Sequence, residues 1–242
     1  CEAMWFSPGQ DGGESLEVGY DAVSGAKFLD WARREKVFLV PLDAEGRWFR
    51  FHLLFQSLLR GELARRWSPE KVAELHLRAS QWFAENGLPD EAVHHALSGG
   101  DLESALRTIE EHRFQLLDRG QWVKLDEWLK LLPQEAKDTE PNLLLSRAWM
   151  ADFCGRPADL ISVLEKLGEM EEQGGLDQTQ RTEASIWRGY FEFWTDQLEA
   201  CRDTLQGALV HAEDMPDMAR AIAEFYLALA LQAVGGDGPN AV

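Results

Sequence analysis

The sequence predicts a mainly α-helical protein, in which a stack of antiparallel helix pairs follows a small module with one β-hairpin. From residue 69 onward, apolar residues recur at helical spacing between short turns that contain glycine or proline. Before that point, two short runs of β-branched and aromatic residues flank a turn. Turns this short require consecutive helices to pack antiparallel.

The first 67 residues contain the pattern of a mixed module. The expected elements are a Gly-rich loop at 7–19, a helix at 24–36, strands at 37–40 and 48–51 around a turn at 43–46, and a helix at 53–67. Basic residues near the end of the first helix suit the negative pole of its dipole. The order helix, hairpin, helix is typical of part of a winged-helix module.

Helix boundaries in the rest of the chain are marked by caps and breakers. Ser68 is the expected N-cap of a helix that starts at Pro69, and Asp101 can cap a later one. Every segment between breaks has a helical pattern and an expected length of 10 to 20 residues. The breaks fall at 86–89, 98–101, 119–120, 133, 140–141, 155–157, 174–175 and 215–216.

The C-terminal segments repeat one another. Residues 147–164 align without a gap on residues 188–205, at an offset of 41 residues, and large aromatic residues recur at equivalent places. A looser third copy starts near residue 225 and has no second helix, so we expect the natural protein to continue past Val242 and, since the chain begins at Cys1, to be longer at both ends. This period fits tetratricopeptide-like helix pairs, which stack into a right-handed solenoid.

Charge and composition exclude several functions. Lys and Arg number 24 against 42 Asp and Glu, a formal charge of −18, which disfavours binding to nucleic acid or to an anionic membrane. No uninterrupted apolar run is long enough to span a bilayer. The cysteines show no metal-binding spacing. We expect Cys154 and Cys201 to be buried apolar residues in a reducing, cytoplasmic setting.

One long string of residues resembles a known family. Phe38 to Asp43, Gly46 to His52 and Leu54-Phe55 are similar to a segment of the large ATP-binding LuxR-type transcription regulators, the group typified by the maltotriose-responsive activator of the maltose regulon. Further similar segments lie at 21–25, 75–80, 82–83, 87–92 and 95–97. The resemblance is strong from about residue 20 to 133 and weaker beyond.

The resemblance implies a segment of a signal-transducing ATPase. In such proteins inducer and ATP favour an oligomer that activates transcription, whereas ADP favours a closed monomer. This chain would hold a partial winged helix (1–67), a helical arm (68–140) and truncated superhelical sensor repeats (141–242). The implied partners are a small-molecule inducer or a protein regulator and the rest of its own polypeptide; self-association is a further candidate interaction. The alternative is a free-standing tetratricopeptide-like adaptor.

No catalytic residue is predicted in this chain. The glycine clusters are not followed by the Gly-Lys-Ser/Thr of a phosphate-binding loop, so ATP or ADP would bind elsewhere in the parent protein and no cofactor is expected here. No basic recognition helix is present either. Acidic pairs such as Glu110 and Glu111 lack an apolar setting that would suit acid–base chemistry.

His52 is the most specific single candidate for a functional residue. By resemblance it matches a winged-helix histidine that contacts the β-phosphate of ADP, and an imidazole N–H can donate to phosphate oxygen. Leu53 follows it where the family often has His or Asp. The alternative is a histidine satisfied within its own module.

A metal site is suggested by the neighbouring residues His94 and His95, with Glu91 close by. Adjacent residues of a helix point about 100° apart, so the two imidazoles cannot easily bind one ion. A structural or solvated role is favoured, and no metal is expected.

A second candidate is an effector surface in the repeats. Aromatic rings can stack on a ligand, and arginine can donate to its polar groups. Aromatic residues at helical spacing more often form the core between helices, and both interpretations remain open. The residues in question are Arg147, Trp149, Trp187, Arg188, Tyr190 and Trp194.

Overall fold

A computed structural model describes residues 31–32, 34–35, 38–43 and 49–235. These residues are mainly α-helical with one small antiparallel sheet, which confirms the predicted fold class. The chain divides into two compact units, residues 1–105 and 106–242. The domain boundaries at 68 and 141, which came from the family resemblance, stay predictions.

The hairpin of the first unit forms as predicted. Strands β1 (Leu39–Pro41) and β2 (Phe49–Phe51) pair antiparallel, with Leu39 opposite Phe51. Most of the predicted turn at 43–46 and most of the predicted helix at 24–36 lie outside the described residues. The ring of Phe55, at the start of helix α3 (Leu53–Arg66), lies 5.4 Å from that of Phe51, so the hairpin packs on this helix.

Helices α4 (Pro69–Glu85) and α5 (Pro89–Ser98) form the first helix pair. Ser68 caps α4 by accepting a hydrogen bond from the Lys71 backbone N–H, and Pro69 takes the first position, as predicted. The Ser80 hydroxyl donates to the buried carbonyl of Ala92 at 2.8 Å. This bond satisfies both polar groups where the two helices touch.

From residue 102 onward the chain continues as helices joined by the predicted breaks. Their bounds are α6 (Leu102–Asp118), α7 (Trp122–Leu131), α8 (Gln134–Thr139), α9 (Pro141–Phe153), α10 (Pro157–Glu172), α11 (Gln178–Trp194), α12 (Leu198–Leu209) and α13 (Asp217–Gly235). The predicted cap of α6 is present, because Asp101 accepts from the Ser104 backbone N–H at 2.9 Å. The expected length of 10 to 20 residues was wrong for α8, where prolines at 133 and 141 confine the helix to six residues.

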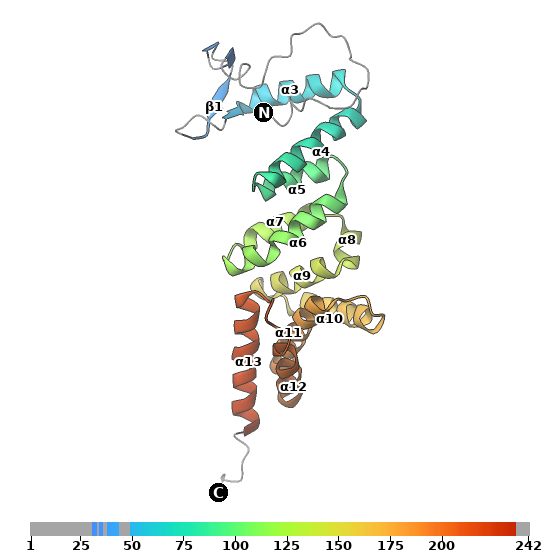
Figure 1. Ribbon diagram of the computed structural model, residues 1–242, viewed down its shortest axis with the longest axis vertical. Coiled ribbons are helices and arrows are strands. Elements are labelled where there is room, and N and C mark those ends of the chain that lie inside the picture. Colours follow the sequence, from blue (N-terminus) through green and yellow to red (C-terminus); the bar gives the residue numbers. More distant parts are fainter. Residues whose placement is uncertain (1–30, 33, 36–37, 44–48, 236–242) are drawn as a thin grey trace. The chain divides into compact units, whose positions relative to one another are not determined.

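The 41-residue period is confirmed by helix ends. Helices α9 and α11 end at Phe153 and Trp194, and α10 and α12 begin 41 residues apart as well. Helix α13 ends at Gly235, one further period on. Within this unit α9 packs on α10 and α11 on α12, and α13 lies beside α11 and α12 (Figure 1).

Each repeat turns at a residue with positive φ. Gly155 has φ +62° and Asp196, one period later, has the same value. In both turns the next residue's N–H bonds back to the last helical turn, Arg156 to the Ala151 carbonyl and Gln197 to that of Glu192. Aspartate tolerates this backbone better than most non-glycine residues, so the repeat keeps its geometry without glycine.

A small, buried residue recurs once in each period. Ala148, Gly189 and Ala230 lie one period apart and are all buried. At Gly189 an added Cβ would lie 2.5 Å from the Leu205 side chain, so α11 and α12 pack too closely for alanine there. Gly168, inside α10, has open space around it.

Two features of this unit differ from expectation. Cys154 is exposed, so its predicted burial was wrong: it follows the last residue of α9, where the chain turns to the surface, whereas Cys201 inside α12 is buried. Helix α13 is, among the described residues, the one helix long and apolar enough to cross a membrane by length and composition. Its contacts with α11 and α12 and its place in the repeat fit a stacked helix.

The different surroundings of Gly189 and Gly168 can be tested by measuring protein stability. We expect Gly189→Ala to lower the free energy of unfolding by about 1–3 kcal/mol, because the methyl group overpacks against Leu205. Gly168→Ala, the matched control, should raise it by about 0.5–1 kcal/mol through helix propensity and a less flexible unfolded chain. Urea unfolding of both variants measures this. Equal effects would mean that close packing at Gly189 is absent.

Candidate functional site

A buried ion pair holds the second unit together beneath the candidate site. The Arg113 guanidinium, on α6, donates to both carboxylate oxygens of Glu183, on α11, at 2.9 and 2.7 Å. Their side chains are 3% and 0% exposed. The Trp149 indole N–H, on α9, donates to the same carboxylate at 2.8 Å. One carboxylate therefore ties three helices, in the bidentate geometry that arginine favours.

Two of the predicted effector residues belong to the core. Trp149 and Trp187 are fully buried, and their rings meet edge-to-face at 4.8 Å. Trp187 in turn contacts Tyr190 at 5.5 Å, and Tyr190 contacts Tyr226 at 4.9 Å. These rings form a continuous ladder through α9, α11 and α13, with the edge-to-face geometry that aromatic pairs prefer.

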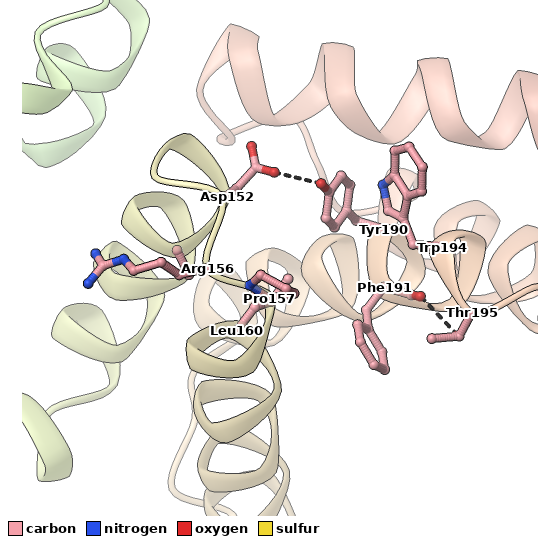
Figure 2. A pocket seen from close by; sticks show the side chains of 10 residues that line it. Asp152, Arg156, Pro157, Leu160, Tyr190, Phe191, Trp194 and Thr195 are labelled. Atoms are coloured by element: carbon pink, nitrogen blue, oxygen red, sulfur yellow. Dashed lines mark hydrogen bonds between the residues drawn. The ribbon is translucent and has the colours of Figure 1, made fainter.

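The ladder ends at a hollow of about 410 Å³, which we call the aromatic pocket. It lies where α9 ends, α10 begins and α11 ends (Figure 2). The Tyr190 hydroxyl donates to the Asp152 carboxylate at 2.6 Å, and the Trp194 side chain, 64% exposed, stands next to it. The lining residues are Ala151, Asp152, Gly155, Arg156, Pro157, Leu160, Tyr190, Phe191, Trp194 and Thr195.

This pocket has features in common with small-molecule binding sites. Its volume lies in the range of small-molecule sites, and such sites combine apolar walls with a few placed polar groups. Burial and the hydrogen bond to Asp152 raise the pKa of Tyr190, so its hydroxyl stays protonated and remains a donor. An exposed tryptophan is a favourable stacking surface for a ring.

The remaining predicted residues lie in different surroundings. Arg147 donates to Asp138 at 2.8 Å and lines a separate hollow beside α7 and α8. Arg188 donates to Glu171 at 2.8 Å and lines a third hollow, against α12. The structure brings Tyr190 and Trp194 together, buries Trp149 and Trp187, and separates the two arginines.

Several pocket residues were missed at the sequence level. Asp152 and Arg156 flank the αL turn at Gly155, and Phe191 follows Tyr190. The repeat alignment drew attention to aromatic residues inside helices. The turn between paired helices was the available signal, because polar residues at a turn remain at the surface.

His52 is positioned by its backbone and leaves its ring accessible. Its N–H donates to the Phe38 carbonyl at 2.7 Å, and its carbonyl accepts from Gln56 at 2.9 Å. The residue is therefore fixed by the hairpin on one side and by α3 on the other. Its side chain is exposed and makes no cap hydrogen bond. Both interpretations of His52, a contact to nucleotide and a histidine satisfied within its own module, stay predictions.

His95 has a different partner from the one considered in the sequence. Its Nδ1 lies 2.9 Å from Nδ1 of His76, on α4, so one imidazole donates to the other. Among the described residues no group of three or more His, Cys, Asp or Glu is placed to hold a metal ion. Burial, with the charges of His76, His94 and Arg60, lowers the pKa of His95 to about 4.

The ion pair can be tested directly. Glu183→Gln should lower the free energy of unfolding by about 3–5 kcal/mol, because it leaves the buried Arg113 charge uncompensated. The double variant Arg113→Met with Glu183→Leu should recover most of that loss, since apolar residues of similar volume replace both charges. Urea unfolding gives both values. A double variant no more stable than Glu183→Gln would contradict this interpretation.

The histidine pair predicts a pH effect. The pKa of His95 is about 4 in the folded protein and has its ordinary value of 6.5 in the unfolded chain. Between pH 6.5 and 4, His95 is therefore protonated in the unfolded chain and neutral in the folded protein. The free energy of unfolding should decrease as the pH falls from 6.5 to 4, and His95 should cause no further decrease below pH 4. His95→Asn keeps a hydrogen-bonding nitrogen but cannot titrate there. Urea midpoints at pH 7 and 5 should differ less for this variant than for wild type or for His211→Asn, a control at an exposed histidine.

Comparison with known proteins identifies the N-terminal module. The model of the MalT winged helix domain matches residues 18–71, which include the hairpin, His52 and α3. Over 197 residues, 80% of this chain, it is 33% identical to serine/threonine-protein kinase PknK of Mycobacterium tuberculosis and to PknK of Mycobacterium bovis. The chain spans about a fifth of the length of these relatives, 18%. No solved structure gives a significant match.

Proposed function

We propose that this chain is the regulatory and sensor segment of an ATP-dependent LuxR-type transcription activator, working in the cytoplasm as part of a longer polypeptide. The observation that carries this proposal is adjacency: a MalT-type winged helix at residues 18–71 leads directly into helix pairs that start at Pro69. On this proposal the chain is itself non-catalytic. It couples the binding of an inducer or protein regulator to nucleotide-controlled oligomerisation.

The aromatic pocket is the proposed effector site. It stands at the end of the aromatic ladder, so a ligand that moves Tyr190 pushes on Trp187 and then on Trp149. Trp149 donates to the buried Glu183 carboxylate, and this carboxylate also holds α6 through Arg113. Contiguous chains of packed side chains and hydrogen bonds of this kind can carry coupling between sites when they have two discrete arrangements.

His52 is the proposed nucleotide sensor. Its ring is exposed at the N-terminus of α3, where unpaired backbone N–H groups and the helix dipole favour an anion. An imidazole N–H there can donate to a β-phosphate oxygen of ADP bound by the rest of the polypeptide. A backbone fixed by both the hairpin and α3 would hold the ring in one place for that contact.

The winged-helix module carries an apolar surface that fits a neighbouring domain. Leu53, Leu54 and Leu58, all on α3, are 68%, 77% and 58% exposed, and α3 has no buried residue. A cluster of exposed leucines next to His52 is typical of an interaction site. We assign it to the rest of the chain's own polypeptide, which would bring the nucleotide to His52.

Substitution of His52 tests the proposal. In the longer polypeptide that contains this segment, His52→Ala should weaken ADP binding about tenfold, the value of one charge-assisted hydrogen bond. It should also raise transcription without inducer, because the ADP-bound state loses its advantage. Calorimetry measures the first effect and a reporter gene the second. His94→Ala, at an exposed histidine on α5, is the matched control. Unchanged ADP affinity in His52→Ala would remove His52 from the mechanism.

A second candidate follows from the relatives. Because PknK is named a serine/threonine-protein kinase, the same segment can serve as the regulatory arm of a kinase. Phosphotransfer by the longer polypeptide, changed by deletion of residues 69–235, would favour this candidate over a transcription activator. A free-standing adaptor remains the other alternative; it predicts capture of a protein partner with no effect of ATP or ADP.

A further inference from the structure

A hollow rich in cations adjoins the aromatic pocket. It has a volume of about 230 Å³ and lies among α7, α8, α9 and α10. We call it the cationic hollow. Four basic side chains and two acidic ones line it, in a chain whose net charge is −18. The charged lining residues are Asp126, Lys130, Lys137, Arg147, Arg156 and Asp159.

The acidic residues leave a positive excess. Lys130 pairs with Asp126 at 2.5 Å, and Arg156 pairs with Asp159 at 3.2 Å. Lys137, at the end of α8, is half-buried and has no acidic partner within 4 Å among the described residues. A cation that is partly desolvated and lacks a counter-charge is an unfavourable feature unless something else supplies the charge.

The nearest additional carboxylate is already shared. Asp138, next to Lys137, accepts from Arg147 at 2.8 Å and from Lys166 at 2.7 Å. Its bonds to Lys166, Gln134 and Arg147 hold the pKa of Asp138 well below its usual range, so it stays ionised. One carboxylate thus serves two cations, and Lys137 remains without compensation.

Arg156 joins the two hollows. It lines both of them, and in Figure 2 its side chain points away from Tyr190 and Trp194. Its backbone and stem therefore border the aromatic pocket, whereas its guanidinium faces the cationic hollow. A ligand that spans Arg156 can reach an aromatic wall on one side and positive charge on the other.

We propose that the two hollows together bind a small organic anion, whose ring packs in the aromatic pocket and whose carboxylate or phosphate reaches Lys137 and Arg156. This inference names the chemical class of the effector in the proposed sensor and rests on that function only for its biological meaning. Asp152 stands on the wall of the aromatic pocket and repels a negative group there. The ligand is therefore oriented with its ring toward Tyr190 and its charge toward Lys137.

Three probe ligands distinguish the contribution of the aromatic ring to the affinity from that of the negative charge. Naphthoate carries both, naphthylmethanol carries the ring alone, and acetate carries the charge alone. By calorimetry on the 242-residue chain at low salt, naphthoate should bind at least about tenfold more tightly than either of the others. Phenyl phosphate, compared with benzoate, shows which anionic group the site prefers.

Variants assign the two halves of the site. Lys137→Gln should weaken naphthoate about tenfold and leave naphthylmethanol unchanged, whereas Trp194→Ala should weaken both. Lys71→Gln, at a lysine paired with Glu74 on α4, is the control and should change neither. Lys137 and Trp194 are not fully buried, so each variant should keep its helical circular dichroism and unfolding midpoint.

Three results would overturn the proposal. These are no detectable heat with naphthoate at millimolar concentration, equal affinity for naphthoate and naphthylmethanol, or no loss of naphthoate affinity in Lys137→Gln. Each concerns the 242-residue chain alone, whereas the role of His52 is tested by ADP binding to the longer polypeptide. If the 242-residue chain does not bind naphthoate but His52→Ala still weakens ADP binding, this inference is rejected and the proposed function is retained.

Discussion

The second unit depends on the bidentate bond between Arg113 and Glu183. These residues are 70 positions apart in sequence, and their burial permits only one arrangement of α6 against α11. Any shift of one helix along the other would leave two charges unpaired without water, at a cost of several kcal/mol. The pair is thus better understood as fixing the arrangement of the helices than as a large net source of stability. Trp149 donates a further hydrogen bond to the same carboxylate, so α9 is fixed by the same acidic group.

This constraint reaches the aromatic pocket through ring contacts. Trp149 is fixed by Glu183, Trp187 packs edge-to-face on Trp149, and Tyr190 packs on Trp187. Tyr190 then bonds to Asp152 at the end of α9, so the chain of contacts returns to the helix where it began. The inner side of the pocket wall is therefore linked by direct contacts to the buried ion pair. Trp194, at the outer end of α11, is 64% exposed and can adapt to a ligand.

Local rules made the helix boundaries and the period predictable, because caps, prolines and positive-φ turns act within a few residues. The candidate site was predictable only in part. Arg147 and Trp149 are two residues apart, as are Arg188 and Tyr190, and such residues point about 200° apart on a helix. An arginine and an aromatic at this spacing cannot share one surface, which explains their separation here. The partnership of Arg113 with Glu183 depends on how distant helices pack, and no local pattern contains it.

The chain has a net charge of −18, so an anion can bind only where nearby basic side chains outweigh the repulsion from the other carboxylates. At physiological salt the screening length is about 8 Å, so distant carboxylates contribute little inside the cationic hollow. A bound anion would meet Lys137 and Arg156 at hydrogen-bonding distance, where charge-assisted bonds are strong. At low salt the same carboxylates would slow the approach of an anion without weakening its final contacts as much. Selection for a ring therefore depends on the aromatic pocket, since only a ligand that also fills this pocket would gain enough contact to stay bound.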